Sequence, residues 1–470
     1  MTPISTAKVA KATGTSPQAH IRSRARARRI FAASGPIRRT HSSSTTVVVL
    51  TGSSVRVGRG RDVDSLDRVD MSELRTLLTP EALRMLDVLG PIASTDAAAR
   101  AVMRLRAEGH SPEFVSAVVG QARLRTRATA KFGEFAERML FTRAGLEQAT
   151  RLGVAARHAG RMRAAGIAHV SDLGCGIGGD ALAFAGAGLG VTAVDADEVT
   201  AALAAYNLAP FGSDAEVRHG FAEDHAPDAP TASVSGPAAV WLDPARRTAG
   251  HSETRRVAAD DYSPSLDWAF ALAARIPTGI KLGPAHDRDT IPSDVEAQWV
   301  SADGDVVELV LWSGVLAREG VRRAALVIRD DRAHELTAPA DTEDAEVREL
   351  GAFVHEPDGA VIRARLIGDL ARRLDAGMLD PHIAYLTSDA PADSPFAASF
   401  RVREVLPMNP KAISTALKKA GIGRLEIKKR GVDVDPAAFR KKLTLRGSAE
   451  ATLILVRVGD RRHAILADRV

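Results

Sequence analysis

Cysteine is nearly missing from this sequence, whose 470 residues include only one, Cys175. A single thiol forms no disulfide within the chain and builds no cysteine-ligated zinc cluster. Long apolar runs are missing too, because no stretch approaches the roughly 18 residues that a membrane-spanning helix needs. We therefore expect a cytoplasmic protein with no membrane segment and no metal site, and the sequence carries no signal of its oligomeric state.

Acidic residues are missing from the first 61 residues, which contain 12 Lys and Arg. Residues 401–470 are also basic, with 17 Lys and Arg against 7 acids, whereas residues 62–400 hold 34 Lys and Arg against 51 acids. Basic ends on an acidic body are typical of modules that attract a polyanion. This charge pattern indicates the class of partner and does not bear on the fold.

The length exceeds that of one typical core, so we expect two or three domains. Residues 1–61 resemble a transit peptide in composition, but a disordered basic tail, or upstream sequence read in frame, is the simpler interpretation. Residues 71–160 place apolar side chains at helical spacing, and Ser111 before Pro112 has the form of a helix cap. This part is predicted to be a helical N-terminal domain.

Helix and strand patterns alternate over residues 161–330, which predicts an α/β domain with a Rossmann-like, doubly wound parallel sheet. Asp303-Gly304 separates two strand-like runs and predicts an antiparallel hairpin at the end of that sheet. Residues 331–400 are expected to be a linker with one helix over 360–379. Residues 401–470 are expected to form a small basic α/β domain.

The segment "HVSDLGCGIGGDALAFA" places a glycine turn between a predicted strand, 169–173, and a helix. Gly174, Gly176 and Gly179 fit the G-x-G-x-x-G spacing, which brings backbone N–H groups at a helix start close to a ligand. Asp195 ends the next strand, 21 residues after Gly174, where a carboxylate accepts both hydrogen bonds of a ribose diol. The alternative for Asp195 is a local capping role at the strand end.

A nicotinamide dinucleotide and S-adenosylmethionine both satisfy this geometry. Asp172, just before the glycines, would repel a pyrophosphate but suits a cationic ligand, and Asp180 at the helix start suits a zwitterionic amino acid. The antiparallel hairpin also favours the second cofactor. We therefore predict that Asp172, Asp180 and Asp195 belong to an S-adenosylmethionine site.

With "VSDLGCGIGGDALAFA" and "VTAVDAD", the sequence resembles the first two motifs of class I S-adenosylmethionine-dependent methyltransferases. The resemblance implies that the glycine turn, with Asp172, Gly174 and Gly176, carries the methionine part of the cofactor, and that Asp195 binds its ribose. It also implies an acid beside adenine, for which "HGFAEDH" offers Asp224 or Glu223. Cys175 is expected to be a packing residue of the turn.

The next strand ends in "WLDPARRT", where Asp243 and Pro244 resemble the fourth motif of methyltransferases that act on nucleic acids. Amino-group methylases usually carry an aromatic side chain after this motif, but here Ala245 and Arg246 follow, which puts exocyclic-amine chemistry in doubt. The motif "LDPAR" is closer to that of RNA uracil-5-methyltransferases, which need a cysteine nucleophile. Because Cys175 is the only cysteine, that mechanism is excluded unless another residue replaces it.

Three further residues are candidates for substrate contact. Arg246, with its neighbour Arg247, could hold an RNA phosphate or base edge, or form a structural ion pair. Tyr262, one of three tyrosines, could stack on a flipped base or pack in the core. Lys281 ends the next strand and could contact substrate or shield a charge. We assign Asp243, Pro244, Arg246 and Tyr262 to the catalytic segment. Gln148 and Thr150, in the "LEQATR" stretch before the fold, could help close the cofactor pocket or lie on an exposed helix face.

Basic residues cluster in the C-terminal part, with 11 Lys and Arg against 3 acids between Lys411 and Arg446. Two runs are predicted to bind phosphates rather than to read bases; they are Lys428, Lys429 and Arg430, and Arg440, Lys441 and Lys442. The segment resembles the THUMP-like domain that follows a methyltransferase domain in a bacterial family, and the resemblance covers about residues 71–470. It implies a structured RNA partner.

The combined prediction is an S-adenosylmethionine-dependent methyltransferase that acts on a base of rRNA or tRNA. One alternative is a catalytically inactive protein that binds S-adenosylmethionine and RNA, favoured by the missing aromatic residue after Pro244. A nicotinamide oxidoreductase is the other alternative, which Asp172 and Asp180 disfavour.

Overall fold

The computed structural model describes residues 70–227, 236–246, 262–330 and 332–470. The expected basic tail, residues 1–61, and Arg247 lie outside the described residues. The described chain divides into two compact units, one that ends at Ala238 and one that runs from Ala239 to Val470. Among these residues, one sheet has nine strands in the order β11-β10-β8-β9-β7-β4-β1-β2-β3, and a second has seven in the order β13-β14-β12-β15-β18-β17-β16.

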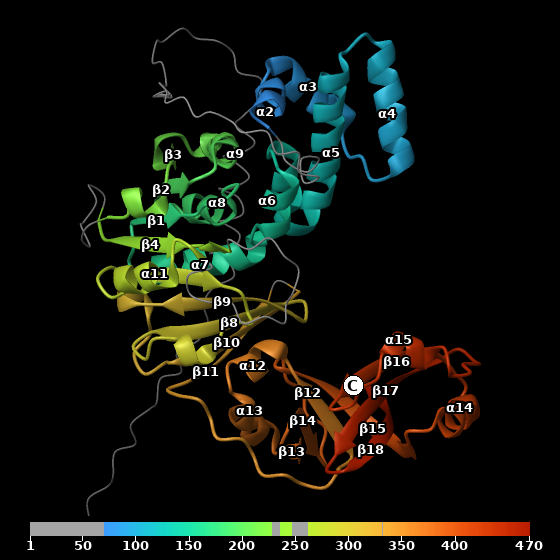
Figure 1. Cartoon of the computed structure of the whole chain (residues 1–470). Helices are drawn as coiled ribbons and strands as arrows, with labels where there is room; N and C mark the ends of the chain where they lie inside the picture. The colour runs from blue at the N-terminus through green and yellow to red at the C-terminus, as the bar shows by residue number, and fades with distance from the viewer. Residues whose placement is uncertain (1–69, 228–235, 247–261, 331) are drawn as a thin grey trace, which may run out of the picture. The chain divides into compact units, whose positions relative to one another are not determined.

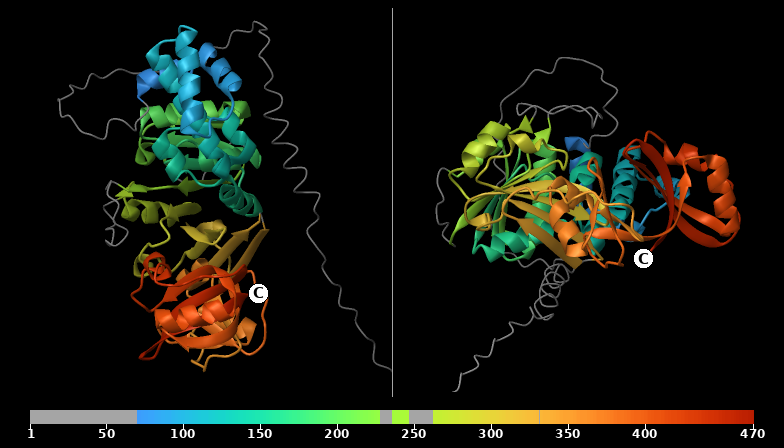
Figure 2. Two further views of the ribbon diagram at one scale, coloured as in Figure 1. Left: turned by 90° about the vertical axis from the view of Figure 1, so that its right-hand side faces the viewer. Right: turned by 90° about the horizontal axis from the view of Figure 1, so that it is seen from below.

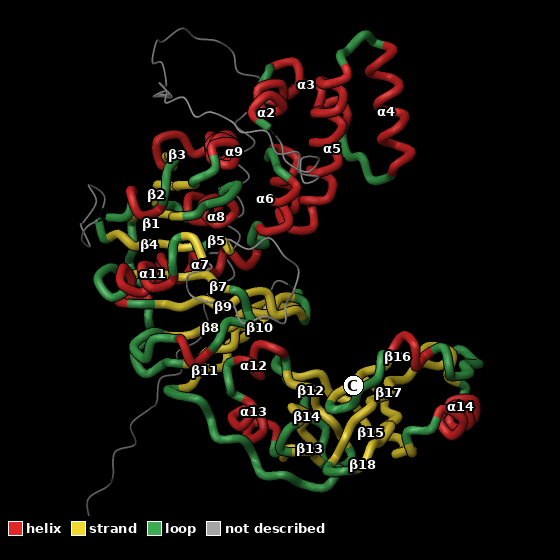
Figure 3. Tube along the Cα trace, in the orientation of Figure 1, coloured by secondary structure: helices red, strands yellow, loops and turns green. Residues whose placement is uncertain are grey.

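The first unit begins with helices only, as the tube in Figure 3 shows, and this confirms the expected helical N-terminal segment. These helices are α2 (Met71–Leu77), α3 (Pro80–Leu89), α4 (Thr95–Ala107), α5 (Pro112–Phe132), α6 (Arg143–Gln148) and α7 (Leu152–Ala164). The Ser111 hydroxyl accepts a hydrogen bond from Phe114 N at 3.2 Å, so the predicted cap is confirmed. Helices α2, α3 and α4 pack against α5.

Strand and helix then alternate, as the 161–330 pattern predicts. The elements are β1 (His169–Leu173), α8 (Gly179–Gly186), β2 (Gly190–Asp195), α9 (Glu198–Leu208), β3 (Ala215–His219) and α10 (Ala222–His225). Strands β1, β2 and β3 pair in parallel. Helices α8 and α9 lie beside these strands in Figure 1. The apolar residues of β1 and β2 are buried, as expected where helices cover a parallel sheet.

The second unit supplies the other part of the nine-stranded sheet. Its elements are β4 (Ala238–Leu242), β5 (Ala245–Arg246), β6 (Tyr262–Ser263), α11 (Leu266–Ala273), β7 (Thr278–Leu282), β8 (Glu296–Ala302), β9 (Asp305–Trp312), β10 (Arg323–Arg329) and β11 (Arg332–Ala338). Asp303 and Gly304 have φ values of 54° and 94°, and they turn β8 into the antiparallel β9. The predicted hairpin is therefore confirmed. Strand β9 lies between β7 and β8, and β10 and β11 extend the sheet beyond it.

The linker expected over residues 331–400 is wrong, because this stretch contributes strands to both sheets. Strand β11 pairs with β10, while β12 (Phe353–Pro357), β13 (Gly377–Asp380) and β14 (Ile383–Ser388) build one side of the seven-stranded sheet. The boundary expected at residue 401 falls inside β15 (Ala397–Pro407). Strand β12 is short and nearly all buried, so it lacks the alternation that marks a strand in sequence.

The single helix expected over 360–379 is two helices, α12 (Gly359–Arg363) and α13 (Ile367–Leu374). Arg365 between them has φ of 58°, in the left-handed region. Its carbonyl accepts hydrogen bonds from the backbone N and Oγ1 of Thr342, at 3.0 and 2.9 Å. Contacts with a distant segment thus compensate for a break that the helical periodicity does not reveal.

The C-terminal elements follow the predicted order: β15, α14 (Pro410–Lys419), β16 (Ile422–Arg430), α15 (Pro436–Arg440), β17 (Ala449–Val458) and β18 (Arg461–Arg469). Asn409 and Asp435 cap α14 and α15, as predicted. The sheet is curved (Figure 2). One apolar cluster lies against α14 and α15, and another contains Tyr385 and Phe400. No described helix is long and apolar enough to cross a membrane.

Candidate functional site

The glycine turn between β1 and α8 is held by backbone contacts with the end of β2. Gly174, Gly176 and Gly178 have φ values of 90°, 55° and 88°, a region that side chains with a Cβ rarely occupy. The N–H groups of Gly174 and Cys175 both donate to the carbonyl of Val194, at 2.9 and 3.0 Å. The turn therefore requires glycine for conformational reasons, independently of any ligand.

Asp195 connects the end of β2 to this turn. Its Oδ2 accepts a hydrogen bond from Gly176 N at 2.9 Å, and its Oδ1 accepts one from Asp197 N at 3.0 Å. Burial raises the pKa of the Asp195 carboxyl, and these two hydrogen bonds oppose the shift. Each oxygen of a carboxylate has two lone pairs, so both remain able to accept a ribose hydroxyl.

Asp172 lies in β1 with 1% of its surface exposed. Burial, with the charges of Asp172 and Asp195, raises the pKa of the Cys175 thiol well above its usual range. The thiol is therefore protonated at neutral pH and fits the expected packing role. The buried Asp172 and Asp195, whose pKa is raised by burial, place two carboxyl groups next to the backbone of this turn.

Asp180, predicted to contact the cofactor, has partners within the protein. Its Oδ2 accepts a hydrogen bond from Thr150 Oγ1 at 2.7 Å, and its Oδ1 lies 2.8 Å from His158 Nδ1. All three side chains are buried. Asp180 thus positions the start of α8 against α7, and its direct contact with the cofactor stays a prediction. His158 was not among the predicted residues, because its spacing from Thr150 gives no signal without the fold.

Two more side chains, also missed from the sequence, hold the segment around the turn. The buried Asn207 amide donates to the carbonyls of Ile177 and Leu140, at 2.9 and 3.0 Å. Lys131 Nζ donates to three carbonyls at the end of α6, those of Leu146, Glu147 and Ala149. The Asn207 contact holds the turn at Ile177, and the Lys131 contacts hold the end of α6.

The turn fits a zwitterionic nucleoside ligand. A Cβ placed on Gly176 would meet no protein atom within 4 Å, so the space beside its backbone is open. Carboxylates at Asp172 and Asp195 supply acceptors for an ammonium group and for ribose hydroxyls. Within the described residues, no cluster of His, Cys, Asp or Glu is arranged to hold a metal ion.

The end of β3 presents an aromatic ring where an acid was expected. Glu223 and Asp224 lie in the short helix α10 and are exposed. Phe221, one residue before α10, is 60% exposed, which is unusual for a phenylalanine. Gly220 N donates to the carbonyl of Asp195 at 3.0 Å, which ties this segment to the predicted ribose acid. Phe221 was not among the predicted site residues, although it lies within "HGFAEDH".

In the second unit, Asp243 follows β4 and is paired with Lys281 of β7. Lys281 Nζ lies 2.5 Å from Asp243 Oδ2, and the two side chains are 12% and 35% exposed respectively. Pro244 is buried. Lys281 thus neutralises the Asp243 charge and fixes the orientation of its carboxylate, which is one of the two roles considered for it.

The structure brings Arg246 and Tyr262 together through their backbones. Strands β5 and β6 form an antiparallel ribbon in which Arg246 is directly opposite Tyr262. Tyr262 is only 2% exposed, so the packing alternative explains its burial better than a role in stacking on a flipped base. Its stacking role would require the residues that cover the ring to move.

The predicted phosphate-binding residues have unequal surroundings. The first run lies within β16, not after it, and Lys428 Nζ pairs with Glu356 at 2.7 Å and Glu426 at 3.3 Å. Arg430 lies over the Tyr385 ring. Arg440 donates to the carbonyl of Leu425. Four of the predicted residues are exposed: Lys429, Arg440, Lys441 and Lys442.

A parallel sheet with an inserted antiparallel strand, together with a glycine turn next to an acidic β2 end, defines a class I S-adenosylmethionine-dependent methyltransferase fold. The chain is 33% identical over 365 residues to an uncharacterized S-adenosylmethionine-dependent methyltransferase of Mycobacterium tuberculosis H37Rv, covering 76% of this chain and 96% of that protein. The protein of strain CDC 1551 / Oshkosh matches equally well. The chain therefore belongs to the S-adenosylmethionine-dependent methyltransferases, and its cofactor is S-adenosylmethionine.

Two domain families and one crystal structure add to this comparison. A THUMP domain-like family matches residues 397–469, and a domain of unknown function matches residues 70–128. The crystal structure is that of a Porphyromonas gingivalis W83 protein, itself only provisionally assigned as a methyltransferase. It superposes with a TM-score of 0.66 at 21% identity and covers 86% of this chain and 99% of that one. It shows the same fold.

Proposed function

We propose that this protein transfers the methyl group of S-adenosylmethionine to a base of rRNA or tRNA. The observation that carries the RNA part is the THUMP domain-like match over residues 397–469, the segment in which basic residues concentrate. A basic surface on a small α/β unit suits backbone phosphates of RNA. Residues 62–400, by contrast, hold 34 Lys and Arg against 51 acids.

We assign the cofactor to the glycine turn. Asp172 and the backbone of Gly174 and Gly176 would line its methionine part, and Asp195 would bind its ribose. S-adenosylmethionine supplies a methyl group on a positively charged sulfur. The residues of the turn contribute by fixing its position, because alignment of the two reacting atoms is the main source of rate in such a transfer. Asp224 and Asp180 remain candidates for additional contacts.

Asp243 and Pro244 are assigned to the substrate side of the reaction. In open α/β sheets, ligands bind beyond the carboxyl ends of the strands, and Asp243 directly follows β4. The Asp243 carboxylate, oriented by Lys281, would accept a hydrogen bond from the base that attacks the methyl carbon. Arg246 would contact the substrate beside it, and Tyr262 would support the Arg246 strand through the β5–β6 ribbon.

The proposal is tested on RNA from cells. Nucleosides from total RNA of a deletion strain are compared by mass spectrometry with those of the wild type and of an Asp243→Ala strain. We expect one methylated nucleoside to be lost in both altered strains, and its identity gives the modified atom. If every methylated nucleoside persists in both strains, RNA is not the substrate.

A catalytically inactive protein that binds S-adenosylmethionine and RNA is the second candidate. The ion pair between Lys281 and Asp243 favours it, because a carboxylate already engaged by an ammonium group is a weaker hydrogen-bond acceptor. Arg246 stands where amino-group methylases carry an aromatic ring, which points the same way. Cofactor binding and RNA binding without labelled methyl transfer would identify this second function.

A further inference from the structure

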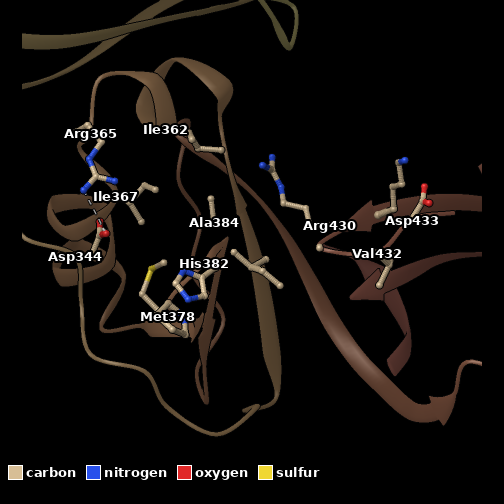
Figure 4. Close-up of a pocket in the computed structure, with 14 residues that line it drawn as sticks. Asp344, Ile362, Arg365, Ile367, Met378, His382, Ala384, Arg430, Val432 and Asp433 are labelled. Atoms are coloured by element: carbon tan, nitrogen blue, oxygen red, sulfur yellow. Dashed lines mark ion pairs between the residues drawn. The ribbon is translucent and has the colours of Figure 1, made fainter. Parts of the chain in front are cut away.

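The second unit contains a pocket of about 860 Å³ between the two edges of the curved seven-stranded sheet. One wall is formed by α12, α13 and the turn between β13 and β14, and the other by the end of β16 and the residues after it (Figure 4). Strand β16 is one edge of this sheet and β13 is the other. The pocket therefore lies where curvature brings the two ends of the sheet towards each other.

Two contacts hold the edges of the sheet close to each other beside this pocket. Gly431 has φ of 65°, and a Cβ on it would lie 2.8 Å from Ile383 Cδ1. A glycine here lets the chain after β16 approach β14 closely. Gly459 N donates to Asp380 Oδ2 at 2.8 Å and joins the β17–β18 turn to the end of β13. The pocket is a preformed feature of the sheet, since both of its walls are tied to it.

The floor of the pocket is apolar. It is lined by Ile362 and Ile367 of the two helices, Met378 and Ile383 of the strands, and Val432 after β16. Pockets of a few hundred to about 1,000 Å³ with apolar walls and a few charged groups are the usual form of small-ligand sites. A flat, weakly polar group fits such a floor better than a solvated ion does.

The rim of the pocket is cationic. Among the described residues, neither Lys429 nor Arg430 has an ion-pair partner, whereas their neighbour Lys428 pairs with two glutamates. Arg430 packs on Tyr385, and its buried Nε has no hydrogen-bond partner in the described part of the chain. Figure 4 shows its guanidinium turned towards the pocket side that carries Ile362 and Ala384.

Other charged groups of the lining leave this rim positive. Arg365 pairs with Asp344 at 3.6 Å, so these two charges offset each other. Asp433 is exposed, and one negative charge does not neutralise both Lys429 and Arg430. The exposed His382 stands at the opposite wall and adds a hydrogen-bonding ring. The lining therefore combines an apolar floor with two available cations at one side.

We propose that this pocket binds one unpaired nucleotide of an RNA, with the base on the apolar floor and its phosphate on Lys429 and Arg430. An apolar base with a phosphate matches both parts of the lining, and aromatic or apolar contact with a base tolerates any sequence. The inference rests on the proposed RNA substrate, but it concerns an anchoring site in the second unit and not the methyl-transfer site.

The test uses the full-length protein and a short, fluorescein-labelled single-stranded RNA of mixed sequence. Lys429→Gln removes one rim charge, and Ala384→Phe fills the floor without changing charge. Lys419→Gln is the matched control, because it removes the same charge from an exposed lysine of the same domain, in α14. Unfolding temperature and S-adenosylmethionine binding are measured for each variant to establish that it is folded.

We expect Lys429→Gln and Ala384→Phe each to weaken RNA binding about tenfold, which corresponds to the loss of one good contact. Lys419→Gln should stay within about twofold of the wild type. For Lys429→Gln the slope of log affinity against log salt should fall by about 0.7, the value for one phosphate contact on a single strand. Ultraviolet cross-linking should mark the peptide that contains His382.

Several outcomes would overturn the pocket. If Ala384→Phe binds RNA as tightly as the wild type, the pocket takes no part in binding, and Lys429 and Arg430 act only as a general electrostatic surface. Equal losses in Lys429→Gln and Lys419→Gln would lead to the same conclusion. If inorganic phosphate competes with the RNA as strongly as a mononucleotide does, the base does not contribute to binding at this site.

The test separates this inference from the proposed function. Pocket-dependent RNA binding by a protein that transfers no methyl group to RNA would support the pocket and reject the reaction. Methyl transfer to RNA that none of the pocket variants alters would do the opposite.

Discussion

Lys281 Nζ lies 2.5 Å from Oδ2 of Asp243, so the carboxylate proposed to face the substrate is held by an ammonium group from the neighbouring strand. The two residues come from the ends of β4 and β7, which pair in parallel. We expect Asp243→Asn to lower labelled methyl transfer to total RNA by about 100-fold, since an oriented acceptor is worth a few kcal/mol in such sites. Binding of S-adenosylmethionine, measured by calorimetry, should be unchanged.

The same pair gives a control. Lys281→Arg preserves a cation next to Asp243, whereas Lys281→Met leaves a partly buried carboxylate without this partner. We expect Lys281→Met to reduce kcat about tenfold or more and Lys281→Arg to retain most of it. If Lys281→Met raises the activity instead, the ion pair restrains the site and does not orient Asp243 for the reaction.

Asp195 should control cofactor affinity. Asp195→Asn replaces one carboxylate oxygen with an NH2 donor, which conflicts with the N–H group of either Gly176 or Asp197. We expect S-adenosylmethionine to bind about 10- to 100-fold more weakly, in line with the loss of hydrogen bonds to a charged group. Calorimetric titration measures the change, and Asp214→Asn, at an exposed acid of the same unit, serves as the control.

The raised pKa of Asp195 makes this affinity dependent on pH. The ionised carboxylate accepts ribose hydroxyls, and burial favours the protonated form in the free protein. As pH falls through the raised pKa, cofactor affinity should decrease, and the decrease should begin at a higher pH than for an ordinary aspartate. Asp195→Asn should give a flatter profile, and a wild-type profile as flat as the variant's would rule out this residue as the titrating group.

The buried contact between Thr150 and Asp180 should contribute mainly to stability. Thr150→Val keeps the shape but removes the hydroxyl that donates to Asp180 Oδ2 at 2.7 Å. We expect the free energy of unfolding to fall by about 1–3 kcal/mol, the usual cost of a buried acceptor that loses its donor. Chemical denaturation measures this change. Thr150→Ser, which keeps the hydroxyl, should recover most of the loss.

Phe221 should support the adenine side of the cofactor. Its ring is 60% exposed at the end of β3, so Phe221→Ala should not lower the unfolding temperature. We expect S-adenosylmethionine affinity to drop about tenfold, because an aromatic contact is worth about 0.5–1.5 kcal/mol beyond its buried area. Phe221→Tyr should bind as the wild type does. Equal affinity of the alanine variant would leave Asp224 or Glu223 as the adenine contact.

Local patterns in the sequence predicted the elements well. The order of strands and helices around "HVSDLGCGIGGDALAFA" depends on glycine, capping and apolar spacing within a few residues. The caps at Ser111, Asn409 and Asp435 form as expected. Such signals act between neighbours in the chain, so they are readable without the fold.

The strands of residues 331–400 could not be predicted in the same way. Strand β12 is five residues long and lies between β14 and β15, so nearly all of its side chains are buried. A short strand buried on both faces lacks the alternation of a half-exposed strand. Its partner strands, β14 and β15, also follow it in the sequence only after helices α12 and α13.

What the sequence by itself determined is the family, the glycine turn and the acids around it, because these follow from short segments with fixed spacing. Only the tertiary structure decided which charges are already paired. Lys428 meets Glu356 from a distant strand, while Lys429 beside it has no ion-pair partner among the described residues. Neighbouring residues of a strand point to opposite faces, and the register between strands then selects their partners.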